Sequence, residues 1–482
     1  MDSNTNDFIN IVRDCGPSEC MLTAWHELGL YFRTSNTATL KIPRAKRTNV
    51  SVTHLIRTAV AQVMLKQPVM RVGIIGETKK RPQFIALSSI DLSEQVEDDQ
   101  ASSLDDVARN LEKLLLQPWS ELSRRPGWHV RIFHEPESSG GEFYRVRVCL
   151  TVHHAICDGI STAMFQSSLV EALNNPDANV ALMVHKSLLV KLTDDLSDFP
   201  PSQHQLFKFT ADISWVLSKI WDYSVPSILK PLSLKRWSGK PCDPNIKAAR
   251  LRYLVVDSTF TNVIVDKCRE NGTTLTNLLN ALCVVSFARR VKTTTRQGFE
   301  SSTSISLRPY IPEEASFDKC HMSLCVTGYN QEFGPDILAK AQTGVDSDIW
   351  ELAARLREDL KRKMDMLPHN DFSFLSPYIS DWYGFTQARY GKPRRELWGL
   401  SNLGLITAPS KGLWELESVM FAQFFPVVSA ALTVSVASVD RGDMVISFMW
   451  QDGILETGLI EDVRDDLDRW LTELGEEGSL GV

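Results

Sequence analysis

The segment His153-His154-Ala155-Ile156-Cys157-Asp158-Gly159 gathers residue types that perform acid–base chemistry into seven positions. Histidine is the side chain whose ordinary pKa lies nearest physiological pH, so an imidazole held neutral can act as a general base. The pattern HHxxxDG is too specific to be expected by chance in most chains of this length. We therefore take this segment as the candidate catalytic centre.

The flanking residues predict the elements that position it. Residues 143–152 alternate in polarity and are rich in β-branched side chains, which predicts a strand that ends just before the histidines. Downstream, apolar residues from Ile160 to Leu173 recur at helical spacing. The pattern indicates a strand, a tight catalytic loop and then a helix.

Strand alternation assigns the two imidazoles to different faces. Residues two apart share a face, so His154 goes with Val146 and Val148, whereas His153 goes with Arg145 and Arg147. Burial disfavours the charged form of an imidazole. We therefore predict that His154 is the neutral general base and that His153 is its structural neighbour.

The motif resembles the active-site signature of the chloramphenicol acetyltransferase-like superfamily. That superfamily includes CoA-dependent acyltransferases, the plant BAHD enzymes, fungal alcohol acetyltransferases and the condensation domains of peptide synthetases. The resemblance implies that His154 removes the acceptor's proton and that Asp158 forms a structural salt bridge with a distant arginine. It also implies that Gly159 relieves crowding beside the loop. Our predicted catalytic pair is thus His154 and Asp158.

Two further segments carry the resemblance. Residues 305–310, Ile-Ser-Leu-Arg-Pro-Tyr, are similar to the family's strand whose arginine pairs with the motif aspartate, which implies an Asp158–Arg308 ion pair. Residues 398–404, Trp-Gly-Leu-Ser-Asn-Leu-Gly, resemble a Ser-Asn segment of the fungal alcohol acetyltransferases, which makes Ser401 and Asn402 candidate oxyanion donors. An ordinary polar turn is an equally acceptable interpretation of the second segment.

The absence of one family motif indicates which branch of the superfamily the sequence resembles. The plant branch carries an Asp-Phe-Gly-Trp-Gly motif that does not occur in this sequence, so the fungal alcohol acetyltransferase-like branch fits better. The implied fold class is α/β, with two chloramphenicol acetyltransferase-like lobes. Each lobe would be a mixed sheet with flanking helices, and the active-site tunnel would lie at their interface, a common location for small-molecule sites.

The length and two breaks in the pattern predict the domain organisation. A chain of 482 residues exceeds the usual size of one hydrophobic core. Breaks at Pro200-Pro201 and at residues 237–241 divide it into an N-terminal lobe (1–200) that carries HHxxxDG, a crossover segment (201–245) and a C-terminal lobe (246–482). Within the crossover, residues 207–221 form an aromatic-rich helical stripe. We expect a helix packed on the second lobe, and a lid over the acceptor or a membrane-surface helix remain alternatives.

Composition excludes several classes of function. The net charge of −7 argues against nucleic acid as a partner, because phosphate binding needs clustered cations. The N-terminus lacks the apolar core of a secretory signal, and no apolar run is long enough to span a membrane. Nine cysteines without CxxC pairs or histidine partners at metal-ligand spacing indicate neither a metal site nor a disulfide framework. We expect a cytoplasmic monomer without a metal, for which peripheral membrane contact stays open.

The sequence thus predicts a CoA-dependent O-acyltransferase of secondary metabolism. It would move an acyl group, and we expect an acetyl group, from acetyl-CoA as co-substrate to a hydroxyl of a small, fairly apolar alcohol, with no permanently bound cofactor. One alternative is a condensation-type enzyme that uses a carrier-protein-bound acyl donor. A second alternative is a non-catalytic binding protein of the same fold.

Overall fold

The alternating segment before the motif folds as β8 (Phe143–Val152), the central strand of a five-stranded mixed sheet in the first lobe. The computed structural model describes residues 10–47, 49–136, 141–193, 195–224, 234–246, 248–294, 296–315, 317, 319–409, 411–424 and 428–482. Residues 225–233 of the predicted crossover segment, and residues 1–9 of the predicted first lobe, lie outside this description.

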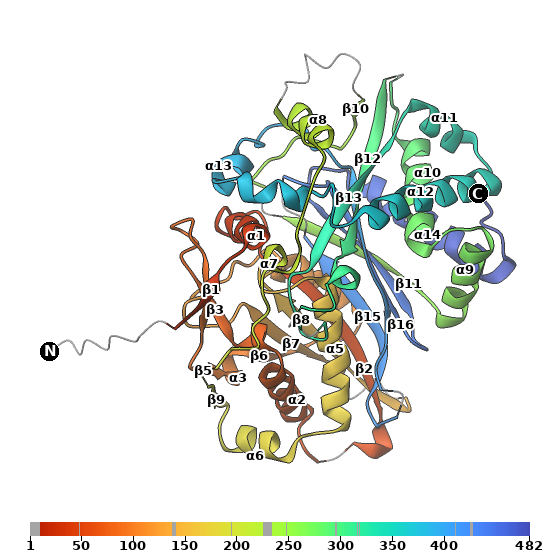
Figure 1. The fold of residues 1–482 in the computed structure, drawn as a ribbon. Coiled ribbons are helices and arrows are strands. Elements are labelled where there is room, and N and C mark those ends of the chain that lie inside the picture. The colour runs from red at the N-terminus through yellow and green to blue at the C-terminus, as the bar shows by residue number, and fades with distance from the viewer. Residues whose placement is uncertain are drawn as a thin grey trace.

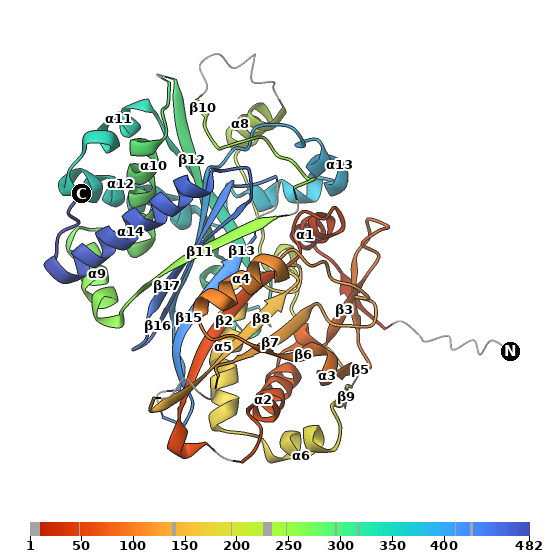
Figure 2. The ribbon, with the colours of Figure 1, turned by 180° about the vertical axis from the view of Figure 1, so that it is seen from behind.

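The five-stranded sheet has the strand order β15-β2-β8-β7-β6. Its other strands are β2 (Thr34–Pro43), β6 (Val96–Gln100), β7 (Trp128–His134) and β15 (Glu415–Gln423). The helices around it are α1 (Pro17–Glu27), α2 (Val52–Lys66), α3 (Leu92–Gln95), α4 (Leu104–Leu114), α5 (Gly159–Asn174) and α6 (Ala178–Lys186). Figure 1 shows α2 and α5 over one face of this sheet, and Figure 2 shows α4 over the other.

Smaller sheets complete the first lobe. β1 (Ile11–Asp14), β3 (Val72–Ile75) and β4 (Gln83–Ala86) form one of them, in the order β1-β4-β3. β5 (Ser89–Asp91) pairs with β9 (Leu189–Lys191) in the other. The turn that joins β3 to β4 carries Glu77, whose carboxylate lies close to His153 of the catalytic loop.

The second lobe is built on a seven-stranded mixed sheet with the order β10-β12-β14-β16-β17-β11, and β13 pairs with β12 off this path. The strands are β10 (Lys235–Arg236), β11 (Ala249–Val256), β12 (Gln297–Ser306), β13 (Val326–Phe333), β14 (Trp398–Ile406), β16 (Leu432–Val439) and β17 (Met444–Gln451). The helices are α9 (Ser258–Glu270), α10 (Leu275–Arg290), α11 (Pro335–Thr343), α12 (Asp346–Met366), α13 (Trp382–Gln387) and α14 (Thr457–Glu477). The crossover contributes α7 (Gln203–Leu206) and α8 (Ile213–Ser224).

The chain does not divide between the lobes where the sequence predicted. β15 lies within the predicted C-terminal lobe (246–482), yet it pairs antiparallel with β2 and forms an edge of the first lobe's sheet. Two hydroxyls of the second lobe bind this strand: Thr433 Oγ1 donates to the carbonyl of Gln423 at 2.9 Å, and Ser447 Oγ donates to that of Phe421 at 2.5 Å. β15 therefore ties the two lobes together beside the catalytic loop.

Each lobe has its own apolar core, and a third cluster joins them. Leu251 on β11, Met420 on β15 and Val445 on β17 are buried together with Val107 and Leu111 of α4. Burial of apolar area stabilises an association by roughly 25 cal/mol per Å². This cluster therefore helps to hold together the two lobes that share the site. Among the described helices, none combines the length and the apolar character that a membrane span needs.

Candidate active site

The predicted catalytic loop begins where β8 ends. The N–H of His153 still pairs across to the carbonyl of Gly127 at 2.7 Å, but the chain then turns, and the N–H of Ile156 donates back to the carbonyl of His153 at 3.0 Å. α5 starts at Gly159. The two histidines therefore occupy a tight turn between a central strand and a buried helix, as the sequence predicted.

The hydrogen bonding of His154 fixes its tautomer. Its Nδ1 lies 2.8 Å from the carbonyl oxygen of Cys157, so Nδ1 carries the proton. The lone pair is then on Nε2, which leaves this nitrogen able to accept a proton. The ring meets that of Tyr31 edge-on, with centroids 5.6 Å apart. Burial lowers the pKa of His154 below its ordinary 6.5, although the Cys157 carbonyl and the charge of Asp158 act to raise it.

His153 has different surroundings. The residue is 1% exposed, whereas His154 is half-buried. Its Nδ1 accepts a hydrogen bond from the N–H of Ala155 at 3.1 Å, and its ring lies against that of His26, with centroids 4.7 Å apart. The strand alternation correctly gave the two rings different neighbours. It placed His154 on the apolar face, yet His153 is the more buried of the two, because the strand and its alternation both end at Val152.

Asp158 caps α5 and holds the loop to the second lobe. One oxygen, Oδ1, accepts from the N–H of Ser161 at 2.9 Å. The other, Oδ2, accepts from Arg308 Nη1 at 2.8 Å and from the N–H of Cys325 at 2.9 Å. The predicted ion pair between Asp158 and Arg308 is therefore present. Burial raises the pKa of Asp158, but the guanidinium of Arg308 outweighs this and lowers it below the ordinary 3.8.

The ion pair is one part of a buried network. Arg308 Nη2 donates to Ser161 Oγ at 2.8 Å and to the carbonyl of Ser323 at 3.0 Å. Ser161 Oγ in turn donates to that same carbonyl at 2.8 Å. Asp158 does not line the active-site cavity, and its two oxygens are both used within this network. In this geometry both carboxylate oxygens of Asp158 are engaged in holding the loop, so we expect it to act as a positioning residue. Sequence reasoning missed Ser161 and Ser323, for which no spacing provides a signal.

Gly159 lies where two bulky side chains converge. A Cβ at this position would lie 2.8 Å from Leu403 Cδ2 and 2.9 Å from Phe421 Cζ, and real Cβ contacts are not that short. Leu403 comes from β14 and Phe421 from β15, both of which meet α5 here. The absence of a side chain is therefore a packing requirement, in agreement with the crowding that the resemblance implied.

Replacing Gly159 with alanine should destabilise the protein by about 1–3 kcal/mol, since both neighbours are buried and must shift. Turnover should also fall, because the strain is applied at the first residue of α5, next to the loop. Chemical denaturation and steady-state kinetics would measure both effects. Gly458→Ala is a matched control, as nothing lies within 4 Å of a Cβ at that position. Equal stability of the two variants would contradict this packing role.

The two oxyanion candidates point to opposite sides of β14. Asn402 Nδ2 donates to Thr276 Oγ1 of α10 at 3.1 Å, and its Oδ1 accepts from the N–H of Gly404 at 2.8 Å. Ser401 lies on the opposite face with Leu403, which packs toward α5. The structure does not support Asn402 as an oxyanion donor, because its amide is engaged on the helix side of the sheet. Ser401 faces the first lobe, although neither residue lines the described cavity.

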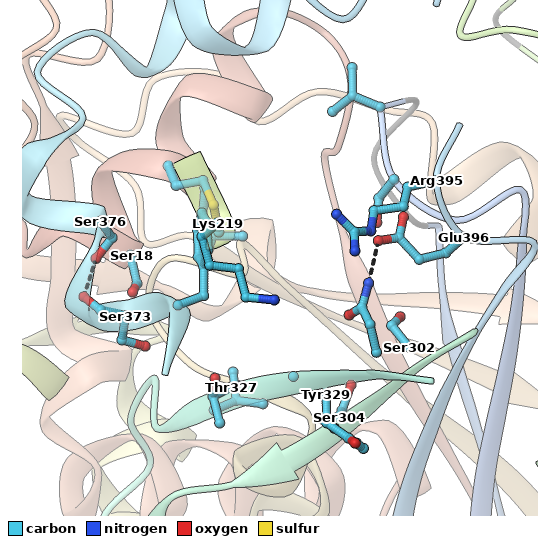
Figure 3. Close-up of a pocket in the computed structure, with 18 of the residues that line it drawn as sticks. Ser18, Lys219, Ser302, Ser304, Thr327, Tyr329, Ser373, Ser376, Arg395 and Glu396 are labelled. Atoms are coloured by element: carbon cyan, nitrogen blue, oxygen red, sulfur yellow. Dashed lines mark hydrogen bonds between the residues drawn. The ribbon is translucent and has the colours of Figure 1, made fainter. Parts of the chain in front are cut away.

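A cavity of about 720 Å³ lies between the lobes, and His154 is part of its wall. The first lobe contributes Met21 and Trp25 of α1 together with Tyr31, and the second contributes β12 and β13. This volume is within the range of small-molecule sites. Figure 3 shows the polar part of the lining, which includes Ser18, Ser302, Ser304, Thr327, Tyr329, Ser373, Ser376, Arg395 and Glu396.

The two ends of the aromatic stripe at 207–221 pack differently. Phe207 is buried in a cluster with residues of β12 and the turn after it, as expected for a segment packed on the second lobe. α8 differs: Trp215 and Lys219 line the cavity, and Lys219 extends into it (Figure 3). The outward face of α8 exposes Ile213 and Leu217, at 79% and 60%. α8 is therefore a cover over the cavity and not a helix buried against the second lobe.

Comparisons with known proteins agree with this geometry. The family model described as alcohol acetyltransferase matches residues 74–457. The chain is 59% identical over 476 residues to FCK4 of Fusarium pseudograminearum, a probable alcohol acetyltransferase, covering 98% of this chain and 97% of that one. It is 20% identical to crmB of Aspergillus fumigatus, another probable alcohol acetyltransferase, over 93% and 97% of the two chains.

Solved structures share the two-lobed fold. The TRI3 trichothecene 15-O-acetyltransferase of Fusarium sporotrichioides superposes with a TM-score of 0.70 at 13% identity, over 94% of this chain and 93% of that one. The condensation domain of the polyketide synthase MokA gives a TM-score of 0.59 at 10% identity, over 98% and 99%. At these identities the likeness concerns the fold. The family match and the extensive identity to FCK4 show that this chain is an acyltransferase that belongs to the alcohol acetyltransferase family.

Proposed function

We propose that this acetyltransferase uses acetyl-CoA as donor and a hydroxyl of a small molecule as acceptor, with His154 as general base. The observation that carries the proposal is the tautomer of His154. Its Nδ1–H is committed to the Cys157 carbonyl, so an unprotonated Nε2 is available in a ring that lines the cavity between the lobes. The low pKa that burial imposes keeps this nitrogen unprotonated at neutral pH.

In the proposed mechanism, His154 Nε2 removes the hydroxyl proton as the acceptor oxygen attacks the thioester carbonyl. The carbonyl electrons move to oxygen, and the resulting oxyanion needs hydrogen-bond donors, for which Ser401 is the remaining candidate. Collapse of the tetrahedral intermediate breaks the C–S bond and expels the CoA thiolate. The imidazolium of His154 returns its proton to that sulfur. No acyl-enzyme forms, so the kinetics should require both substrates to be bound together.

The polarity of the cavity lining changes the kind of acceptor that we expect. Apolar and aromatic side chains such as Met21 and Trp25 agree with an apolar part. The hydroxyls of Ser302, Ser304 and Tyr329 would be left without partners by a purely apolar ligand, and a buried polar group without a partner is costly. We therefore propose an acceptor that combines an apolar portion with several hydrogen-bonding groups.

The test is thiol release from acetyl-CoA in the presence of a panel of hydroxylated metabolites, with mass spectrometry of the products. The proposal expects an O-acetylated product and stoichiometric CoA thiol, only when donor and acceptor are both present. A parallel reaction with an acetyl group on a carrier protein separates the free-CoA donor from the condensation-type alternative. Activity with the carrier-bound donor alone would contradict the acetyl-CoA assignment. Binding of CoA without turnover of any acceptor would favour a non-catalytic role.

A further inference from the structure

A second polar cluster lies directly behind the catalytic loop, on the side of His153. Glu77, in the turn between β3 and β4, lies with Oε1 3.4 Å from His153 Nε2. The same oxygen lies 3.3 Å from Nδ1 of His26, in the last turn of α1. None of the three atoms has a hydrogen-bond partner within the usual limits among the described residues, and all lie within 4.8 Å of one another. Three segments distant in sequence therefore meet at one carboxylate.

Backbone hydrogen bonds determine where the protons of this cluster are. The N–H of Trp119 donates to His26 Nε2 at 3.1 Å, so Nε2 must hold a lone pair. The N–H of Ala155 donates to His153 Nδ1 at 3.1 Å, so that nitrogen also holds a lone pair. A neutral imidazole carries one proton. In both rings it must lie on the nitrogen that faces Glu77, so two N–H groups converge on one carboxylate oxygen.

These tautomers argue against a metal site. Two histidines and a glutamate form a typical ligand set for zinc, which binds imidazole through a lone pair. Here the nitrogens that would bind the ion, His26 Nδ1 and His153 Nε2, are the ones that carry protons. Binding a metal would require both rings to become imidazolates or to lose their hydrogen bonds from Trp119 and Ala155. The donor set therefore fits a hydrogen-bonded carboxylate better than a coordinated cation.

The charge of Glu77 is maintained by its neighbours. Burial raises its pKa, but interactions with His153 and His26 outweigh this and lower the pKa of Glu77 to about 2. Burial lowers the pKa of His153, which favours its neutral form. The cluster therefore places a carboxylate opposite two N–H donors, a charge-assisted arrangement.

Glu77 is held in place independently of the histidines. Gly76 has φ +78°, and a Cβ there would lie 2.2 Å from the carbonyl oxygen of Arg81, so only glycine allows this turn. The hydroxyl of Tyr383 in α13 donates to the backbone carbonyl of Glu77. Lys80 and Asp381 add an ion pair at 2.9 Å between the turn and the start of α13. The carboxylate thus projects from a fixed support toward the loop.

We propose that Glu77 is a positioning residue that orients His153 and, through Ala155, the loop that carries His154, and that it also fixes α1 through His26. α1 supplies Met21 and Trp25 to the wall of the cavity. One carboxylate therefore fixes the position of the loop that carries His154 and the position of part of the cavity wall. The effect on catalysis rests on the function proposed above. The arrangement of the three side chains does not.

The variant Glu77→Gln keeps the shape of the side chain and removes its charge. We expect kcat to fall about tenfold, the lower end of the loss that follows removal of a partner orienting a metal-bound imidazole, with a smaller change in KM for acetyl-CoA. Glu27→Gln is a matched control, because it removes the same charge from an exposed side chain one residue from His26. An unchanged kcat in Glu77→Gln would overturn the positioning role.

A spectroscopic measurement tests the arrangement without relying on activity. In protein labelled with ¹⁵N-histidine, His26 should appear as the Nδ1–H tautomer and His153 as Nε2–H, with both N–H protons shifted downfield by the carboxylate. Both signals should move upfield in Glu77→Gln and stay in place in Glu27→Gln. Equimolar Zn²⁺ should leave the wild-type signals unchanged. Loss of both N–H signals on adding Zn²⁺, or the opposite tautomers, would overturn the proposal. If the enzyme shows these signals but no acetyl transfer, the proposed function fails and the cluster stands.

Discussion

Replacing His154 with alanine is expected to lower turnover at least about a hundredfold, because the loss of a positioned general base removes 10²–10⁴ of rate. The acceptor hydroxyl would then have to lose its proton to water during attack. KM for acetyl-CoA should change little, since the lost interaction is with a proton that moves only in the transition state. Steady-state kinetics with both substrates would measure the two parameters.

The matched control is His185→Ala, which removes an exposed imidazole from α6, away from the cavity. It should leave turnover unchanged. Thermal unfolding should show that the His154 variant is folded, because the side chain is half-buried and makes one hydrogen bond. Near-normal turnover in a folded His154→Ala protein would eliminate His154 as the base.

Breaking the Asp158–Arg308 ion pair should produce the largest loss of stability. Either Asp158→Asn or Arg308→Met leaves a buried group without its charge partner, which typically costs about 3–5 kcal/mol. Turnover should fall as well, since the pair holds the start of α5 against the second lobe. Denaturant unfolding of the two single variants and the double variant would measure the coupling, and the double variant should lose less than the sum.

The sign of the pH dependence follows from the pKa of Asp158. It is lower in the folded protein than the ordinary 3.8, so its contribution to stability is complete above that pH and is lost as the pH falls further. The exposed pair Arg269–Asp266 on α9 is the control, and Asp266→Asn should not change stability measurably. Additive losses in the double variant at the buried pair would show that the two charges do not act together.

The sequence predicted the centre of the site well because its signals are local. Alternation over residues 143–152 and helical spacing after Ile160 gave β8, the loop and α5. The contact between Asp158 and Arg308 spans 150 positions and came from the resemblance, since no periodicity encodes such a pair. Gly159 was also understood only through the family, because its crowding comes from Leu403 and Phe421 on other strands.

Other features were not accessible from the sequence. Residues 415–423 form a strand, but which sheet β15 joins is decided by tertiary packing and not by local propensity. Asn402 was a reasonable donor by type, but a one-residue step along β14 turns it to the helix side. The cluster of Glu77 with the two histidines has no characteristic spacing, since its members are contributed by a helix, a turn and a loop. Whether α8 covers the cavity also depends on contacts between distant segments, so the sequence could not decide between a lid and a helix packed on the second lobe.

The pH dependence of kcat/KM tests the protonation state of His154 most directly, because this parameter reports the ionisations of the free enzyme. The low pKa of His154 predicts a plateau at neutral pH and an acid limb with its midpoint below 6.5, where Nε2 becomes protonated and activity is lost. The residual activity of His154→Ala should lack that limb. A midpoint above 6.5, or the same limb in the variant, would contradict a neutral His154 as the base.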